Sequence, residues 1–471
     1  MTESVIIIGG GLAGLAAASA LATRGVEVNL LESRPRLGGR AASFLDRETD
    51  TLIDNCQHVT MGCCACFNHF CNEVGVAHLF QTADQLFFVA PADAAGRFCI
   101  DALYASPLPA PLHLVPAFRK LSYLSGTERR TLARGLASLA RATPESLRGQ
   151  NFQTWLRTRH QPASLIDKFW HTILVSALSE SLDRIDAAIA RKVFVDAFLR
   201  RHDGWKVSIP CVALDEIYDC NVTHHLAAHG ATIELNAGVE RLIVEDERVT
   251  GVELRDGLRH SADQFILAVS HDRVRARLPE PLVRHPTLAG LARLESAPIS
   301  SVHLWFDRPI TDLPHAVFID RLSQWMFNRS TPNRGDAEEP THYYQVVISA
   351  SHDLANLTRD DVVQRVVAEF RDVWPQATRA ALLHSRVVTE HKAVFAPTPG
   401  SEALRPRQQS PIGNLQLAGD WTRTGWPATM ESAVRSGYLA AENVLARLRR
   451  PETLVPPHLP NALLSKLLFR L

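Results

Sequence analysis

The most unusual polar cluster of the chain lies in residues 54–58, of sequence DNCQH. An acid, two amides and a histidine so close together can donate and accept protons at a buried site. Residues 51–53 before them form a short strand-like run, so the cluster is expected where a strand ends. Asp54 and His58 are therefore the candidate catalytic residues, and a buried structural imidazole is an equally good interpretation of the histidine.

Three glycines in the spacing Gly9-x-Gly11-x-x-Gly14 predict a phosphate-binding turn. They follow four β-branched residues, 5–8, which are typical of a buried parallel strand, and they open an Ala- and Leu-rich helix over residues 12–24. Glycine here allows a tight turn, close approach of the backbone to a pyrophosphate, and close packing of helix on strand. The order of strand, glycines and helix predicts a dinucleotide site.

The residues after this turn support the same site. Leu12 and Ala13 begin the helix, whose unpaired N–H groups and positive dipole end favour phosphate. A second apolar strand over residues 26–31 leads into Glu32 and Ser33. Glu32 lies at the separation expected of a carboxylate that accepts hydrogen bonds from an adenosine ribose, and both residues are expected to contact the cofactor. A glycine-rich turn without a ligand is the alternative.

Residues 34–40, of sequence RPRLGGR, combine a paired-glycine turn with three arginines. Such a loop can place the N–H groups of Gly38 and Gly39 and the guanidinium of Arg40 against a diphosphate. NAD-dependent enzymes with a Rossmann fold need no second phosphate loop after the acid, whereas enzymes that bind FAD in an extended form do. The loop therefore favours FAD, with a solvated basic turn as the alternative.

A second strand-to-helix junction lies near the C-terminus. Residues 415–418 predict a buried strand that runs into a Gly-Asp pair, and residues 425–437 begin a long helix. An aspartate at a strand end can bind ribityl or pyrophosphate groups, and the positive helix end stabilises an anionic reduced flavin at its N1–C2=O edge. The residues expected to contact the cofactor here are Gly419, Asp420, Thr429, Met430 and Glu431.

Both ends of the chain resemble the flavin amine oxidase and phytoene desaturase superfamily. The Gly-Gly-Arg loop and the Gly-Asp…Thr-Met-Glu-x-Ala-x-x-Ser-Gly pattern of residues 419–437 carry the resemblance. It implies an α/β fold in which a Rossmann-type, amine oxidase-like FAD-binding domain is interleaved with an α+β substrate domain and a helical insertion. It also implies that the backbone of Val239 holds the adenine. Because no cysteine follows Cys220, a cysteinyl-flavin link near the C-terminus is impossible, and non-covalent FAD is expected.

Two segments resemble the hydroxysqualene dehydroxylases, also called squalene-associated FAD-dependent desaturases. They are residues 54–58, in which Cys56 takes a position that is glycine in many members, and residues 425–431, of sequence GWPATME. The resemblance implies reduction of hydroxysqualene to squalene with loss of water, on the route to hopanoids. Asp54 or His58 would then protonate the departing oxygen. An apolar terpenoid substrate and an unidentified electron donor are the implied partners.

Three other functions stay open. A carotenoid or phytoene desaturase would run the same flavin oxidatively and remove hydride from a polyene. A flavin amine oxidase would need a cage of aromatic residues around a neutral amine, and no such constellation can be assigned. A non-enzymatic protein of this fold would bind prenyl chains without flavin, and the intact FAD motifs argue against it.

The order of the predicted elements divides the chain into cofactor, substrate and tail parts. Two intertwined domains are the expected arrangement for 471 residues. The FAD-binding domain is expected in residues 1–97, 201–290 and 401–450, the helical cap insertion in 98–200, the substrate-domain sheet and helix in 291–400, and a Pro-rich linker with an amphipathic tail in 451–471.

Composition limits the partners and the location. The 50 basic and 50 acidic residues cancel, so nothing favours nucleic acid. Five cysteines crowd into residues 56–71 without the paired CxxC spacing of zinc sites, so no metal is expected. No run of about 18 apolar residues predicts a membrane span. The N-terminus lacks the basic region of a signal peptide, so the protein is expected in the cytoplasm.

Two apolar stretches leave open a peripheral contact with the cytoplasmic face of a membrane. Residues 103–124 are rich in Leu, Pro and aromatic residues and carry Arg119 and Lys120. A short tail helix over residues 462–471 is marginal alone and needs a surface, which is either the protein's own domain, a partner or a membrane. The leucines on one face of this helix are Leu464, Leu467, Leu468 and Leu471.

Overall fold

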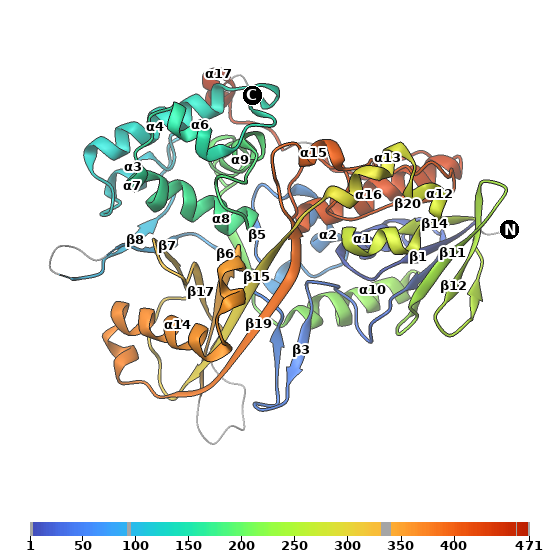
Figure 1. The fold of residues 1–471 in the computed structure, drawn as a ribbon, viewed down its shortest axis with the longest axis horizontal. Helices are drawn as coiled ribbons and strands as arrows, with labels where there is room; N and C mark the ends of the chain where they lie inside the picture. The colour runs from blue at the N-terminus through green and yellow to red at the C-terminus, as the bar shows by residue number, and fades with distance from the viewer. Residues whose placement is uncertain (1–2, 92–95, 331–340, 458, 470–471) are drawn as a thin grey trace.

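Figure 1 shows the fold in a computed structural model that describes residues 3–91, 96–330, 341–457 and 459–469. A parallel sheet with its helices occupies one end of the molecule. A larger sheet and a layer of helices occupy the other end. Both ends draw strands from distant parts of the chain, as the predicted interleaving requires.

The cofactor-binding end is built on a five-stranded parallel sheet in the order β10-β2-β1-β14-β20. The central strand β1 is almost fully buried, which agrees with its run of β-branched residues. Because β1 and β20 come from opposite ends of the chain, the sheet closes only through long-range pairing, and the predicted α/β Rossmann-type fold is confirmed. The strands are β1 (Ser4–Ile8), β2 (Glu27–Leu31), β10 (Thr232–Glu234), β14 (Gln264–Leu267) and β20 (Leu415–Leu417).

Two long helices cross closely beside this sheet. Helix α1 (Leu12–Ala22) is buried on all sides, and it packs against α16 (Met430–Arg447). A Cβ added to Gly437 of α16 would collide with the carbonyl oxygen of Ala13, so only glycine permits this approach. The helix that follows the first glycine turn is therefore locked to the helix that follows the Gly-Asp pair.

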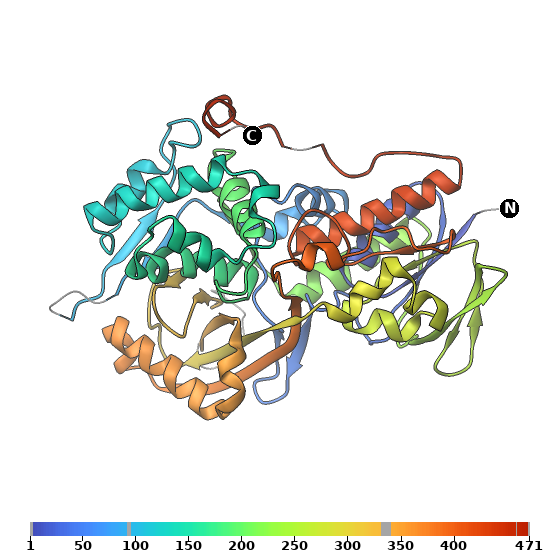
Figure 2. The same cartoon turned by 45° about the horizontal axis from the view of Figure 1, so that its top comes forward.

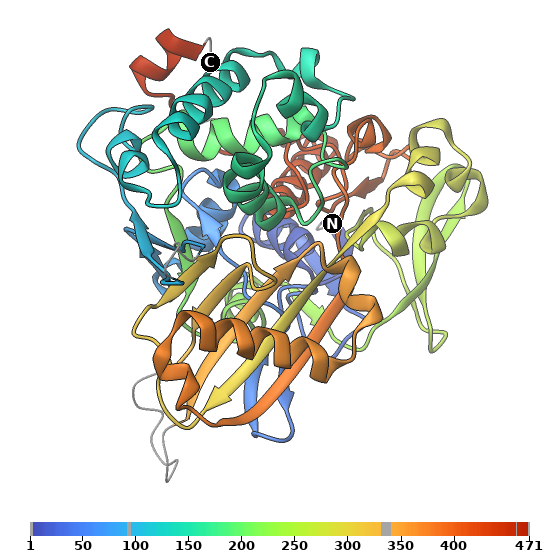
Figure 3. The same ribbon diagram turned by 60° about the vertical axis from the view of Figure 1, so that its left-hand side comes forward.

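The substrate end is built on a seven-stranded sheet in the order β19-β15-β18-β17-β16-β7-β8 (Figure 3). Alternate residues of β15 divide between two environments. Val302 and Leu304 pack under α14 (Arg359–Val373), whereas His303 and Trp305 face the N-terminal segment. The strands are β7 (Leu86–Val89), β8 (Ile100–Leu103), β15 (Ser296–Phe306), β16 (His315–Phe318), β17 (Trp325–Asn328), β18 (His342–Ser349) and β19 (Leu382–Phe395).

The division of the chain into cofactor, substrate and tail parts stays a prediction. The pairing of one strand bears on the first boundary. Strand β7 lies in the range 1–97, which was assigned to the cofactor domain, yet it pairs with β16 and β8 of the substrate sheet. Strand β7 thus begins the substrate part earlier than the change of composition near residue 98 suggests. The physical reason is that strand pairing is non-local and leaves no compositional mark.

The predicted helical insertion is a layer of short helices above the substrate sheet (Figure 2). Its core is aromatic: Phe152 stacks on Trp155 at a centroid distance of 5.5 Å, and Trp170 meets Phe194 edge-on at 4.8 Å. A capping box formed by Ser125 and Glu128 starts the longest helix. The helices are α3 (Val115–Lys120), α4 (Gly126–Arg141), α5 (Pro144–Leu147), α6 (Phe152–Thr158), α7 (Ala163–Leu165), α8 (Thr172–Leu178) and α9 (Ala187–Phe194), with π-helical turns at Ile166–His171 and Val195–Leu199.

The C-terminal tail crosses the molecule from the end of α16 to the insertion, where α17 (Leu463–Phe469) docks (Figure 2). The Ser465 hydroxyl donates to the Leu199 carbonyl at 2.6 Å, and Phe469 is buried beside Ala140. The predicted leucine face is not the buried one, because Leu467 keeps 81% of its surface exposed. Leu471, which was expected on that face, lies outside the described residues.

Among the described residues, no helix is long and apolar enough to cross a membrane. Within the same residues, no group of three His, Cys, Asp or Glu side chains is placed to hold a metal ion. The eight cysteines are all free thiols.

Candidate functional site

A cavity of about 390 Å³ opens at the carboxyl ends of β1, β2, β14 and β20, where ligands bind in open parallel sheets. One end is lined by Val239 and Arg255, and the other by His58 and Ser176. It therefore runs from the edge of the cofactor domain to the insertion and the substrate sheet. The expected cofactor residues that line it are Gly9, Gly11, Leu12, Ala13, Glu32, Ser33, Gly38, Gly39, Arg40, Val239, Gly419, Asp420, Thr429 and Met430.

The first glycine turn presents backbone to this cavity. Gly9 has a φ of 111°, a conformation that favours glycine, and the nearest atom to a Cβ on Gly11 would be the Cα of Gly39 at 4.0 Å. Gly14 lies behind the turn, where a Cβ would collide with the Gly9 carbonyl oxygen. Gly9 and Gly11 thus line the cavity, whereas Gly14 lies in close contact with the backbone behind it.

Glu32 connects the two phosphate loops. One carboxylate oxygen accepts from the Gly10 N–H at 2.7 Å, and the other accepts from the Arg34 N–H at 2.8 Å. Since the side chain also lines the cavity, it can still accept hydrogen bonds from a ribose through its remaining lone pairs. Glu32 therefore fixes the loop geometry in addition to its predicted contact.

The Gly-Gly-Arg loop packs backbone to backbone against the first turn. Gly38 and Gly39 both have positive φ, and a Cβ on Gly39 would lie 3.0 Å from the Cα of Gly11. A side chain is therefore excluded at Gly39, where the two loops meet, which leaves backbone N–H groups to face an anion. This cradle of glycine backbone fits a diphosphate.

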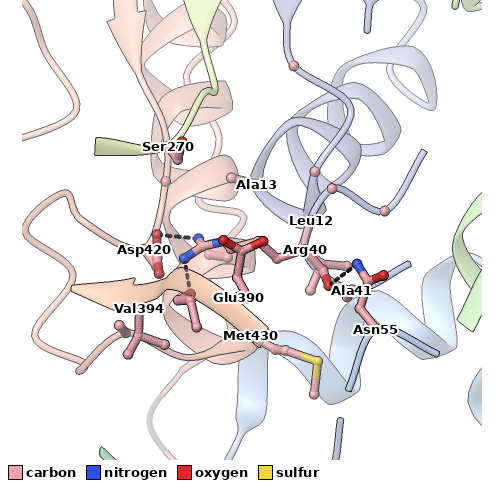
Figure 4. Close-up of a pocket in the computed structure, with 18 of the residues that line it drawn as sticks. Leu12, Ala13, Arg40, Ala41, Asn55, Ser270, Glu390, Val394, Asp420 and Met430 are labelled. Atoms are coloured by element: carbon pink, nitrogen blue, oxygen red, sulfur yellow. Dashed lines mark hydrogen bonds and ion pairs between the residues drawn. The ribbon is translucent and has the colours of Figure 1, made fainter. Parts of the chain in front are cut away.

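Arg40 and Asp420 join the two ends of the chain inside the cavity (Figure 4). Their nitrogen and oxygen atoms lie 2.8 Å apart, and Arg40 also donates to the Ala393 carbonyl. Burial opposes the charge of Arg40, but Asp420 more than offsets this, so the pKa of Arg40 lies above its usual value. Arg40 thus holds β19 and the Gly-Asp turn together. The sequence predicted a contact of Arg40 with the diphosphate but not this structural role.

The loop from Asp420 to Thr429 is held by Arg405, which sequence reasoning missed. The guanidinium is 1% exposed and donates to the carbonyls of Asp420 and Trp426 at 3.0 and 2.8 Å. Thr429 then caps α16, whose first turn lines the cavity. No local motif marks Arg405, because its partners lie 15 to 21 residues further along the chain.

The structure places the Glu431 side chain away from the cofactor cavity. Its carboxylate accepts from the N–H groups of Cys66 and Phe67 at 3.1 and 2.8 Å, in the first turn of α2 (Ala65–Glu73). Burial raises the pKa of Glu431 above its usual value. Its acidic group therefore caps a neighbouring helix, whereas it was expected to contact the cofactor.

The predicted polar cluster is divided by the fold. Asn55, Cys56, Gln57 and His58 line the cavity. Asp54 lies behind them with 3% exposure, as the last residue of β4 (Thr51–Asp54), which pairs with β3 (Ser43–Asp46). There it accepts from the Ser43 hydroxyl at 2.7 Å and from the Leu214 N–H at 2.9 Å. Asp54 is thus placed to anchor the segment rather than to touch a ligand.

His58 is held in one tautomer. Its Nδ1 lies 2.9 Å from the Cys56 carbonyl oxygen, and since a carbonyl only accepts, Nδ1 carries the hydrogen and Nε2 is left as an acceptor. Burial lowers the pKa of His58 below its usual value, so the imidazole is neutral at pH 7. Burial also raises the pKa of the Cys56 thiol to about 12, which keeps that group neutral.

The remaining wall of the cavity comes from elements that carry no motif. Ser176 and Ser179 reach it from the region of α8, and Ile299, Val347 and Val394 reach it from the substrate sheet. Among the lining residues of the described chain there is no Phe, Tyr or Trp. The wall opposite the cofactor loops is thus a mixed apolar and hydroxyl-bearing surface.

These features define a two-domain flavoprotein with its cofactor between a Rossmann-type sheet and a substrate sheet. The chain belongs to the flavin containing amine oxidoreductase family, whose sequence model matches residues 12–445. FAD is its cofactor, and the chain is a flavin-dependent oxidoreductase.

The chain is also similar to carotenoid desaturases and to solved oxidoreductase structures. The chain is 26% identical over 464 residues to the 15-cis-phytoene desaturase of Synechococcus elongatus, covering 94% of this chain and 96% of that protein. It is 25% identical over 486 residues to a probable zeta-carotene desaturase of the same organism, covering 94% and 98%. An oxidoreductase structure from Methanosarcina mazei has a TM-score of 0.71 at 17% identity, covering 92% and 99%, which shows a shared fold.

Proposed function

We propose that this protein is an FAD-dependent desaturase of an apolar isoprenoid, of the carotenoid desaturase type. The likeness to phytoene and zeta-carotene desaturases along nearly the whole chain supports this reaction better than the hydroxysqualene reduction expected from two short segments. The apolar residues of the substrate sheet that line the cavity suit a hydrocarbon.

The residues that hold FAD follow from the cavity. The backbone of Gly11 and Gly39 would face the diphosphate, Glu32 the ribose, and the first turn of α16 the flavin edge. We propose non-covalent binding. Bound FAD supplies a two-electron acceptor of hydride in its oxidised form.

The tautomer of His58 is the structural observation that best supports the proposal. Desaturation removes a hydride from one carbon and a proton from the carbon next to it, so the site needs a group that accepts a proton. A neutral imidazole with a free Nε2 can accept that proton, and the bond from Nδ1 to the Cys56 carbonyl aims the ring. Asp54 holds the backbone of this segment through Ser43 and Leu214.

The test is an anaerobic titration of the oxidised, FAD-loaded protein with phytoene or zeta-carotene. We expect bleaching of the flavin absorbance together with a product that carries one more double bond. A His58→Gln variant should bind FAD normally and bleach at least about 100-fold more slowly, the usual contribution of a general base. Flavin that stays oxidised with every polyene would refute the proposal, and full turnover by the variant would remove His58 from the mechanism.

Hydroxysqualene dehydroxylation is the second candidate, and a specific observation favours it. Asn55, Gln57 and His58 bring polar groups to the cavity, for which a hydrocarbon has no use but a departing hydroxyl does. The electron donor would still need to be identified. Anaerobic addition of hydroxysqualene to the chemically reduced protein tests this reaction, and a flavin that stays reduced while no squalene forms would exclude it.

A location in the cytoplasm stays a prediction. Fractionation of cells that express the full chain would test it.

A further inference from the structure

We propose that α17 and the proline-rich loop before α3 form one surface that binds an anionic lipid bilayer. The two segments are 348 residues apart when measured from Val115 to Leu463, yet both lie at the same end of the molecule in Figures 2 and 3. The apolar members of this bilayer-binding surface are Leu108, Leu112, Val115, Leu463, Leu467 and Leu468.

Both halves of the bilayer-binding surface are fixed to one segment, Leu199–His202. On one side, Ala462 donates its N–H to the Arg200 carbonyl at 2.9 Å, and the Ser465 hydroxyl donates to the Leu199 carbonyl. On the other side, His202 places Nε2 at 2.9 Å from the Ser106 carbonyl oxygen. The surface is therefore held by the folded insertion, although each half is short.

Two leucines of α17, Leu463 and Leu467, take no part in docking the helix. Ser465 and Phe469 make up its buried side, whereas Leu463 and Leu467 are 85% and 81% exposed. In the loop, Leu108 and Leu112 are 44% and 40% exposed. Exposed apolar residues that gather in this way mark an interaction site, while scattered ones need no explanation.

The charges around these residues favour an anionic lipid surface over a neutral one. Lys466 is exposed between the outward leucines of α17. Arg119 and Lys120 are exposed at the end of α3, next to the loop, and Arg134 and Arg141 are exposed on α4, against which α17 packs. Leucines with a basic border are the pattern of a helix that lies in the headgroup region of anionic membranes.

The position of the loop also connects this surface to the proposed function. Leu114 and Ala117, just beyond the exposed leucines, belong to a buried apolar cluster against which Val59 packs. Val59 lines the cavity. If the substrate is an apolar isoprenoid, as proposed above, apolar residues continue from the bilayer to the site where it reacts.

Flotation of the FAD-loaded full chain with vesicles tests this inference. We expect binding to vesicles of equal parts phosphatidylcholine and phosphatidylglycerol, and much weaker binding to phosphatidylcholine alone. Leu463→Ser with Leu467→Ser should lower the partition coefficient at least about 10-fold, given the apolar area removed. Leu108→Ser with Leu112→Ser should lower it by a similar factor, because both halves are required.

A matched control replaces two leucines exposed elsewhere, Leu258→Ser with Leu383→Ser, which are 60% and 55% exposed on other elements. It should bind vesicles as the unchanged protein does, and flavin absorbance verifies folding of every variant. Absence of flotation, or an equal loss in the control, would overturn the proposal. A dimer that the α17 variant converts to monomer, with vesicle binding unchanged, would assign the surface to a second copy. None of these results depends on turnover, so they are separate from the test of the reaction.

Discussion

Replacement of Arg405 by Met should destabilise the protein and weaken FAD binding. The guanidinium is 1% exposed and donates to the carbonyls of Asp420, Thr422 and Trp426. Met fills similar volume but cannot donate, so each of the three carbonyls loses one hydrogen bond, at roughly 1 kcal/mol each. The carboxylate of Glu402, the ionic partner, is 27% exposed and can be hydrated again, so it adds little. We expect a loss of about 3 kcal/mol in the free energy of unfolding.

The same change should affect the cofactor, because these carbonyls belong to the loop that brings Asp420 and Thr429 to the cavity. If about half of the lost free energy falls on the conformation of that loop, the Kd for FAD rises about 10-fold. Urea unfolding of the apoprotein measures the first quantity, and fluorescence titration with FAD measures the second.

Two further variants make this prediction specific. Arg423→Met changes an exposed arginine of the same loop and should alter stability by less than about 0.5 kcal/mol. Arg405→Lys keeps the charge but loses the planar fork, so it should recover only part of the stability. If Arg405→Met unfolds within about 1 kcal/mol of the unchanged protein and binds FAD equally well, the view that this arginine organises the loop is wrong.

Three other predictions follow from buried contacts. Burial lowers the pKa of His303 to about 3, so below pH about 6.5 the unfolded chain takes up a proton that the folded chain does not, and the free energy of unfolding should decrease as the pH is lowered. His303→Gln should make the difference between urea unfolding at pH about 7 and pH about 5 smaller, and an unchanged difference would argue against a neutral buried imidazole. Glu431→Gln leaves one acceptor for two N–H groups and should cost about 1.5–3 kcal/mol; no loss would mean that the native carboxyl is protonated. Gly437→Ala places a methyl group against the Ala13 carbonyl and should lower the free energy of unfolding by about 1–3 kcal/mol, as measured by thermal unfolding. Gly126→Ala, where the added methyl group meets open space, should change it little, and equal effects of the two variants would contradict the close contact of α16 with α1.

The parts of the site that could be predicted from sequence are those that the local backbone dictates. Gly9 and Gly38 adopt positive φ; the turn at Gly9 follows β1 directly, and the turn at Gly38 lies a few residues after β2. A short stretch of sequence contains all the residues that such a turn needs. The same holds for the Gly-Asp pair before α16, which is why the cofactor could be named from two separated segments.

Side-chain directions could not be predicted in this way. Asp54 and His58 look equivalent in sequence, but the pairing of β4 with β3 turns Asp54 toward Ser43 and away from the cavity. Glu431 follows two residues that line the cavity, yet the N-terminus of α2 attracts its carboxylate. Both outcomes depend on neighbours that are distant in the chain.

The tail shows a related limit. A stripe of leucines predicts which face of a helix is apolar, but not whether that face is covered. Here the free carbonyls that follow the π-helical turn Val195–Leu199 draw Ser465 and Ala462 inward, and the leucines are left outside. The hydrogen bond of Ser465 thus lies on the buried side of α17, although the pattern of leucines predicted a different buried side.

The pairing of β14 with β20 sets the order in which the protein can mature. During synthesis, residues 4–31 leave the ribosome first, but the last strand of their sheet ends only at residue 417 and the partner helix of α1 only at residue 447. Until then α1 keeps an uncovered side, and the cavity lacks the wall that contains Asp420. The complete cavity can therefore form only after the chain has been translated through the first turn of α16, which provides Met430 and Ala433. A chain interrupted before β20 would lack the last strand of the parallel sheet as well as the wall that contains Asp420.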